Sequence, residues 1–139
     1  MRELRLPAPI AERIVEHCLA ERPNEACGVL AAANGQVVEV YTMANAAGSP
    51  VRYALDPEEQ FRVYREIEER GWELGGVFHS HTRTEAYPSP TDVRLASEDV
   101  PYLIVSLAVE PPELRAFRIV KEFLTDDHGE IVELAVVVD

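Results

Sequence analysis

Residues 75–92 read GGVFHSHTRTEAYPSPTD. An apolar extended segment is followed by a loop and then by a proline-led capping signature, which predicts a strand ending near His81 and a helix beginning at Pro90. Side chains alternate between the two faces of a strand, so His79 and His81 share one face and Ser80 lies on the other. Two imidazoles are therefore expected to face one point at the end of a strand.

A third ligand for a metal ion is expected one loop downstream of the histidines. A catalytic zinc site uses three protein ligands at about 2.0 to 2.2 Å and leaves one position for water. Asp92 falls at the start of the predicted helix, where exposed N–H groups favour a carboxylate, and the loop can carry it back over the strand end. The predicted metal ligands are His79, His81 and Asp92, with Zn²⁺ as the expected ion.

Glu25 and Ser89 are the residues expected to act beside this ion. Glu25 precedes the apolar run 26–32, where partial burial would raise the pKa of its carboxyl and suit it to accept a proton near neutrality. Ser89 offers a hydroxyl to an oxygen that becomes negative in a tetrahedral intermediate. Spacing alone leaves simpler interpretations open: Glu25 as a surface residue, and Ser89 with Asp92 as a helix cap without a metal.

The rest of the chain alternates helices with strands, which predicts an α+β fold with a mixed or largely antiparallel sheet flanked by helices. Asn34-Gly35 is the dipeptide of a type I′ hairpin turn, and Asp56, Pro57 and Glu59 form a capping-box pattern. The expected helices are 8–21, 57–70 and 90–97, and the expected strands are 26–32, 36–41, 51–55, 72–81, 102–109, 114–120 and 131–138.

Composition limits the class of protein. With 139 residues, 47% hydrophobic and 27% charged, the chain is expected to form a single domain over residues 1–139. Its formal charge of -12 repels phosphate backbones and anionic lipids, so neither nucleic acid nor membrane is an expected partner. Only two cysteines and no secretion signal or apolar membrane span indicate a cytoplasmic protein. The oligomeric state, with a homodimer as one option, is left open.

The active-site pattern also resembles a known family. Glu25, then His79-Ser80-His81, seven further residues and Ser89-Pro90-Thr91-Asp92 resemble the signature of the JAMM (MPN+) metalloproteases. Segments 25–30 and 79–89 are most similar to small bacterial Mec-type hydrolases, and the resemblance extends from the first helix to about Leu107. It implies a JAMM/MPN, cytidine-deaminase-like fold, zinc ligands at His79, His81 and Asp92, a general base at Glu25 and an oxyanion or metal-water partner at Ser89. Thr82 departs from the proline of many members.

The resemblance also implies a function. Mec-type enzymes are zinc metallopeptidases that free an amino acid, typically cysteine, from the C-terminal tail of a ubiquitin-like sulfur-carrier protein that ends in Gly-Gly. One alternative is a non-catalytic MPN scaffold, and another is a deubiquitinase-like isopeptidase acting on a different ubiquitin-like conjugate. A nucleophilic mechanism at Cys27 ranks lower, because no histidine is placed by sequence to activate the thiol. Neither Cys27 nor Tyr87 is assigned a role in the site.

Overall fold

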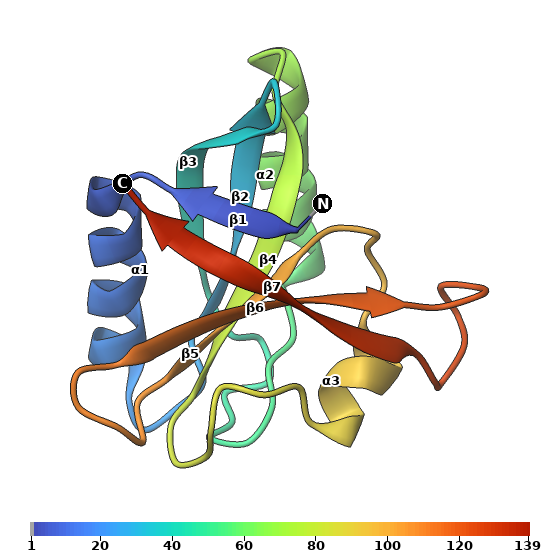
Figure 1. The fold of residues 1–139 in the computed structure, drawn as a ribbon. Helices are drawn as coiled ribbons and strands as arrows, with labels where there is room; N and C mark the ends of the chain where they lie inside the picture. Colours follow the sequence, from blue (N-terminus) through green and yellow to red (C-terminus); the bar gives the residue numbers. More distant parts are fainter. Residues whose placement is uncertain (1) are drawn as a thin grey trace.

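A mixed β-sheet dominates residues 2–139, the part of the chain that the computed structural model describes (Figure 1). In chain order the elements are β1 (Glu3–Leu6), α1 (Ala8–Glu21), β2 (Cys27–Ala33), β3 (Gln36–Met43), α2 (Pro57–Glu69), β4 (Glu73–His81), α3 (Pro90–Leu95), β5 (Tyr102–Ser106), β6 (Glu113–Val120) and β7 (Glu130–Val138). The strand order is β1-β7-β6-β5-β4-β2-β3, with β4–β5 and β1–β7 parallel and the other neighbours antiparallel. This arrangement confirms the predicted α+β class with a mixed sheet.

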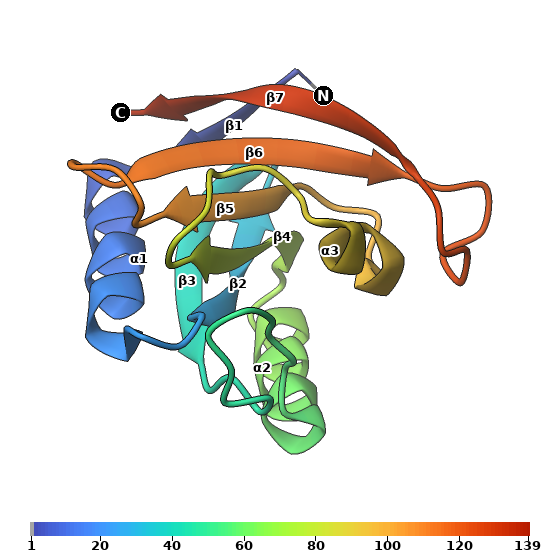
Figure 2. The same ribbon diagram turned by 90° about the horizontal axis from the view of Figure 1, so that it is seen from below.

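The core occupies both faces of the sheet, because side chains alternate along each strand. On one face Leu30 and Phe78 pack with α1, whose Ile14 is fully buried. On the other face Val77 packs with Ile67 of α2. Figure 2 shows α1 and α2 separated by β2, β3 and β4. By the same alternation, the residues that follow Val77 at every second position of β4 lie on the α2 face.

The hairpin between β2 and β3 forms as the sequence predicts. Asn34 and Gly35 both have positive φ, 53° and 77°, as a type I′ turn requires. The Asp56 cap is also present, since Asp56 Oδ2 accepts a hydrogen bond of 3.0 Å from the backbone N–H of Glu59. The predicted capping box there is wrong, however, because Glu59 Oε1 accepts from the backbone N–H of Ala44 at 2.9 Å. That contact ties α2 to the end of β3.

Other boundaries differ from the sequence prediction. Residues 51–55 do not form a strand; Leu55 makes one isolated bridge to Asn45, and side-chain hydrogen bonds hold the loop instead. α3 ends at Leu95 and β5 at Ser106, both earlier than predicted. β1 was not predicted, although its alternation of exposed and buried residues is the period of a strand. Within residues 2–139, no helix is long and apolar enough to cross a membrane.

Candidate metal centre

β4 places two imidazoles at its end, on the α2 face of the sheet. The strand is paired on both sides: His79 lies opposite Cys27 of β2 and Ile104 of β5, and His81 lies opposite Ser106 of β5. The side chains of His79 and His81 are 1% and 5% exposed, and their Nε2 atoms lie 3.1 Å apart. This pairing fixes the backbone of both histidines, and burial restricts their rings.

α3 brings the carboxylate to the same point. Ser89 is the N-cap: its Oγ accepts a hydrogen bond of 3.0 Å from the backbone N–H of Asp92, and Asp92 Oδ2 accepts one of 2.9 Å from the backbone N–H of Ser89. The same Oδ2 lies 3.2 Å from His79 Nε2 and 3.0 Å from His81 Nε2. A complete capping box therefore aims one carboxylate oxygen at both histidines.

The donor atoms of His79, His81 and Asp92 suit a small tetrahedral cation. Atoms bound about 2.0 to 2.1 Å from such an ion lie about 3.3 Å from one another. The observed separations of 3.1, 3.2 and 3.0 Å are close to that value. His81 Nδ1 lies 2.8 Å from the carbonyl oxygen of Glu85, an acceptor that, in the neutral ring, favours the proton on Nδ1 and leaves the Nε2 lone pair facing the centre. The three side chains could therefore hold a metal ion.

The electrostatics of the three groups agree with a shared cation. Burial raises the pKa of Asp92, but hydrogen bonds from the two imidazoles outweigh burial and bring that pKa well below its ordinary value. Burial lowers the pKa of His79, which favours the neutral ring that a metal requires. For His81 burial is outweighed by Asp92 and the Glu85 carbonyl, so its pKa rises. A positive charge beside the Asp92 carboxylate is therefore favourable, whether it is carried by a proton or by a metal ion.

Glu25 lies beside this group as a buried carboxylate. Its side chain is 4% exposed, and within residues 2–139 its Oε1 has no hydrogen-bond partner. Burial raises its pKa to about 7, while the positive charge of His81 opposes the shift. The Glu25 backbone is held on both sides, by a 2.9 Å bond to the carbonyl of Ser49 and by a 3.0 Å bond from Asn45 Nδ2. A fixed carboxylate with a free oxygen and this pKa can act as a proton acceptor near neutral pH.

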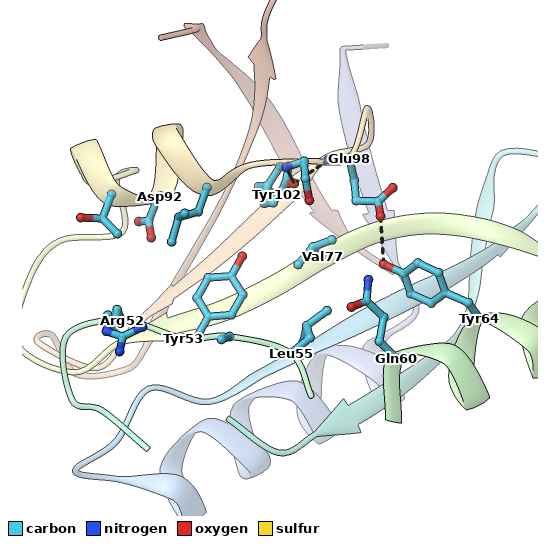
Figure 3. Close-up of a pocket in the computed structure, with 13 residues that line it drawn as sticks. Arg52, Tyr53, Leu55, Gln60, Tyr64, Val77, Asp92, Glu98 and Tyr102 are labelled. Carbon is cyan, nitrogen blue, oxygen red and sulfur yellow. Dashed lines mark hydrogen bonds between the residues drawn. The ribbon is translucent and has the colours of Figure 1, made fainter. Parts of the chain in front are cut away.

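Two pockets open on the centre. The first, here called the tyrosine pocket, has a volume of about 250 Å³, and its lining includes Arg52, Tyr53, Tyr64, Asp92 and Tyr102 (Figure 3). The second, here called the base pocket, has a volume of about 400 Å³ and is lined by Pro23, Glu25, Pro50, Val51, His81, Thr82, Arg83, Thr84 and Ser89. All five site residues predicted from the sequence therefore lie in one region, with His79 buried behind Tyr53.

Sequence reasoning missed three supporting residues. Tyr53 stacks on His79, with ring centroids 4.5 Å apart and planes at 21°. Asn45 donates to the carbonyls of Glu25 and Arg52, both at 3.0 Å, and its Oδ1 accepts from the backbone N–H of Ala54 at 3.1 Å. Ser80, on the opposite face of β4, accepts a 2.8 Å bond from the backbone N–H of Ala26. Of the three, only Asn45 could have been recognised from local sequence, because asparagine favours turns. Its Oδ1 accepts a hydrogen bond from the backbone N–H of Ala47, two residues onward.

Two other residues left open by the sequence have structural contacts. Cys27 is fully buried, its Sγ lies 3.4 Å from the carbonyl of Ala44, and burial raises its pKa to about 12. A thiol that stays protonated is a poor nucleophile, which argues against the Cys27 mechanism. Tyr87 packs edge-on against Phe117, with centroids 5.4 Å apart, and remains 41% exposed. It anchors its loop to β6.

Comparison with known proteins agrees with this geometry. Residues 7–120 match the prokaryotic homologues of the JAB domain, so the similarity continues beyond the expected limit near Leu107. The CysO-cysteine peptidase of Mycobacterium tuberculosis is 42% identical over 131 residues, covering 91% of this chain and 89% of that protein. The probable TtuB-protein conjugate cleaving protease of Thermus thermophilus is 34% identical over 102 residues, covering 73% and 68%.

The fold has a solved counterpart. The solution structure of protein DSY2949 from Desulfitobacterium hafniense superposes with a TM-score of 0.85 at 34% identity, covering 98% of this chain and 92% of that one. Residues 7–120, the segment that matches the JAB-domain family, contain α1 to β6 and with them the histidine pair, the capped aspartate and the buried glutamate. The chain therefore belongs to the family of prokaryotic JAB-domain homologues.

Proposed function

We propose that this protein is a zinc metallopeptidase that hydrolyses the amide bond after the C-terminal Gly-Gly of a ubiquitin-like sulfur-carrier protein and releases cysteine or a short extension. The observation that carries the proposal is the buried Glu25 carboxylate, with a free oxygen, in the same pocket as His81 and Ser89. A structural carboxylate buried to this extent would be expected to have a partner.

We infer that the ion is zinc, held by His79, His81 and Asp92. Two imidazole nitrogens and one carboxylate oxygen, at near-tetrahedral separations, are a typical catalytic zinc set with room for one further ligand. Bound there, zinc supplies a Lewis acid that polarises a carbonyl and lowers the pKa of water to about 7. The assignment is supported by the donor chemistry, since a magnesium or calcium site would be built from oxygen ligands.

Glu25 and Ser89 then divide the proton transfer and the charge stabilisation. The Glu25 carboxylate takes a proton from the attacking water, whose oxygen joins the glycine carbonyl carbon. As the C–N bond breaks, the protonated Glu25 returns that proton to the leaving nitrogen. Ser89 Oγ already accepts from the backbone N–H of Asp92, so its own hydroxyl proton is free to donate to the oxygen that becomes negative.

The proposed substrate class is inferred from the substrates named for the similar proteins. The chain covers most of a CysO-cysteine peptidase at 42% identity, and a carrier tail ending in Gly-Gly is narrow enough to enter a site between two small pockets. The similarity to a TtuB-conjugate protease keeps isopeptide cleavage as the second candidate. Both candidates use the same centre and differ only in the amine that leaves.

The test is incubation of the zinc-loaded protein with CysO carrying one C-terminal cysteine, and separately with TtuB joined to a lysine side chain, read by intact mass. We expect loss of the cysteine from CysO. Glu25→Gln should keep its zinc and lose roughly 10²- to 10⁴-fold in kcat, the usual contribution of a general base. His79→Ala and Asp92→Ala should lose zinc and activity together.

Glu16→Gln, an exposed carboxylate of α1, is the matched control and should behave as wild type. Loss of zinc in Glu25→Gln would overturn the assignment of Glu25 as base. Full activity in His79→Ala would overturn the metallopeptidase. A protein that purifies without metal and cleaves neither substrate would instead be the non-catalytic scaffold.

A further inference from the structure

We propose that the tyrosine pocket receives the residue that is released, and that Arg52 binds the α-carboxylate of that residue. The inference rests on the proposed function, because it assigns the leaving side of the same reaction. It makes Arg52 the residue that selects a free C-terminal amino acid over an isopeptide-linked lysine.

Arg52 is held close to the centre by its neighbours. Its backbone carbonyl accepts a 3.0 Å hydrogen bond from Asn45 Nδ2, the same amide group that bonds to the carbonyl of Glu25. The next residue, Tyr53, stacks on His79. The backbone of Arg52 is thus tied on one side to the proposed base and on the other to a proposed metal ligand.

The Arg52 side chain has no charged partner of its own. The side chain is exposed, and within residues 2–139 it makes no ion pair or hydrogen bond, so its guanidinium is free to bind a ligand. Among the residues lining the tyrosine pocket, Arg52 is the one cation, and it shares the lining with Asp92 and Glu98. In a chain with a charge of -12, a carboxylate would be repelled from this pocket without such a cation. The planar guanidinium can bind a carboxylate through two hydrogen bonds.

The chemistry of the leaving group places its α-carboxylate near the Asp92 end of the pocket, where Arg52 lies. In a released amino acid the leaving nitrogen and the α-carboxylate are attached to the same carbon, so the carboxylate must stay near the site of bond breaking. Figure 3 shows Arg52 and Asp92 towards one end of the pocket, and Gln60, Tyr64 and Glu98 towards the other. A lysine that leaves through its Nζ has no carboxylate at this position and cannot use Arg52.

The rest of the pocket is suited to the side chain of the released residue. Leu55, Val77 and Leu95 supply apolar surface to the lining, and Figure 3 shows Leu55 and Val77 between the Arg52 end and the Glu98 end. Its volume of about 250 Å³ exceeds the roughly 150 Å³ cavity that accommodates benzene in another protein. The pocket is therefore not limited to a residue as small as cysteine.

The test compares two substrates that differ in one group: CysO extended by a cysteine with a free α-carboxyl, and the same adduct with a primary carboxamide. Wild-type zinc-loaded protein should cleave the acid with a kcat/KM at least roughly tenfold above that of the amide, as expected for a charge-assisted contact. Arg52→Ala should bring this acid-to-amide ratio close to one, and Arg52→Lys should restore part of it.

Arg83→Ala is the matched control, because Arg83 is the cation that lines the base pocket. It should keep the wild-type ratio whatever it does to the overall rate. Equal cleavage of acid and amide by the wild type, or an unchanged ratio in Arg52→Ala, would overturn the assignment of Arg52. Loss of the ratio in Arg83→Ala would place the leaving residue in the base pocket instead. If the wild type cleaves neither adduct, the proposed function itself fails.

Discussion

At the residue scale, one oxygen of Asp92 has two structural roles. Asp92 Oδ2 closes the capping box with the backbone N–H of Ser89 and also lies within 3.2 Å of both imidazole nitrogens. Capping and metal binding are compatible because a carboxylate oxygen can accept from more than one direction. The sequence already suggested both roles for Asp92, and in the structure one rotamer lets the same oxygen cap α3 and face both imidazole nitrogens.

Glu25 should make the stability of the metal-free protein depend on pH. Its pKa is raised from 4.5 to about 7 by burial, so its contribution to stability is complete below about pH 4.5 and is lost as pH rises through 7. Metal-free Glu25→Gln avoids the cost of a buried charge. It should exceed wild type by up to about 3 kcal/mol at pH 8 but by less than about 1 kcal/mol at pH 5.

Urea denaturation of chelator-treated protein at the two pH values measures this difference. Glu16→Gln, an exposed-site control that retains Glu25, should follow the stability of wild type at both pH values. A wild type that is as stable as Glu25→Gln at pH 8 would mean that Glu25 is not desolvated in the folded protein.

Sequence reasoning proposed the residues that the structure brings together at this candidate centre, but not those that support them. His79, His81, Ser89 and Asp92 lie in one stretch, where strand alternation and helix capping are local rules that fix their directions. Tyr53 and Asn45 depend on how a loop of irregular backbone folds across β2 and β4. No local periodicity encodes such a path, so the stack on His79 and the bonds to Glu25 could not be predicted.

At the element scale, α3 is a six-residue helix whose N-terminus forms one wall of the site. A helix this short has little stability of its own and depends on its cap and its packing. The capping of α3 by Ser89 is therefore separable from its proposed role as a hydrogen-bond donor to the substrate oxygen.

Replacing Ser89 by alanine or by glycine separates those functions. Both variants lose the hydroxyl, so both should fall by roughly 10²- to 10³-fold in kcat, as when one oxyanion donor is removed. Stability should differ, because an N-cap alanine costs about 1 kcal/mol and an N-cap glycine only a few tenths. Denaturation curves and single-turnover rates on the cysteine adduct measure the two effects. If the rate instead followed stability, so that Ser89→Gly was much more active than Ser89→Ala, the oxyanion role would be contradicted.

Element types were more predictable than element ends. The 3.6-residue pattern of α1 and the Asp56-Pro57 start of α2 are strong local signals, and both helices form. The 51–55 segment resembles a strand by composition, but Asn45 satisfies its backbone groups, at the carbonyl of Arg52 and the N–H of Ala54, so it needs no neighbouring strand. β1 is only four residues long and forms through a partner at the far end of the chain.

At the scale of the whole molecule, the β1 edge of the sheet and the site lie on different strands. β1 pairs in parallel with β7 at one edge and buries Leu4 and Leu6, while the histidines lie on β4, with β5, β6 and β7 between. Such long-range pairing is set by tertiary packing and has no counterpart in local sequence.

Leu6→Ala should destabilise the protein without altering the site. Leu6 is fully buried, so the cavity and lost burial should cost about 2 to 5 kcal/mol. Zinc content and kcat at a temperature where the variant is folded should match wild type. Leu124→Ala, at a loop position that is 47% exposed, is the control and should change stability by at most about 0.5 kcal/mol. A folded Leu6→Ala protein that fails to bind zinc would show that the edge and the centre are coupled.

β4 is hydrogen-bonded to β2 on one side and to β5 on the other, so the backbone that carries both imidazoles is fixed by the sheet. The sheet would in this respect form a receptor before any ion binds, unlike a zinc finger, which is unfolded until metal arrives. Ions can enter and leave such a receptor without refolding of the chain. Metal supply, rather than chain synthesis, would then decide when the enzyme becomes active.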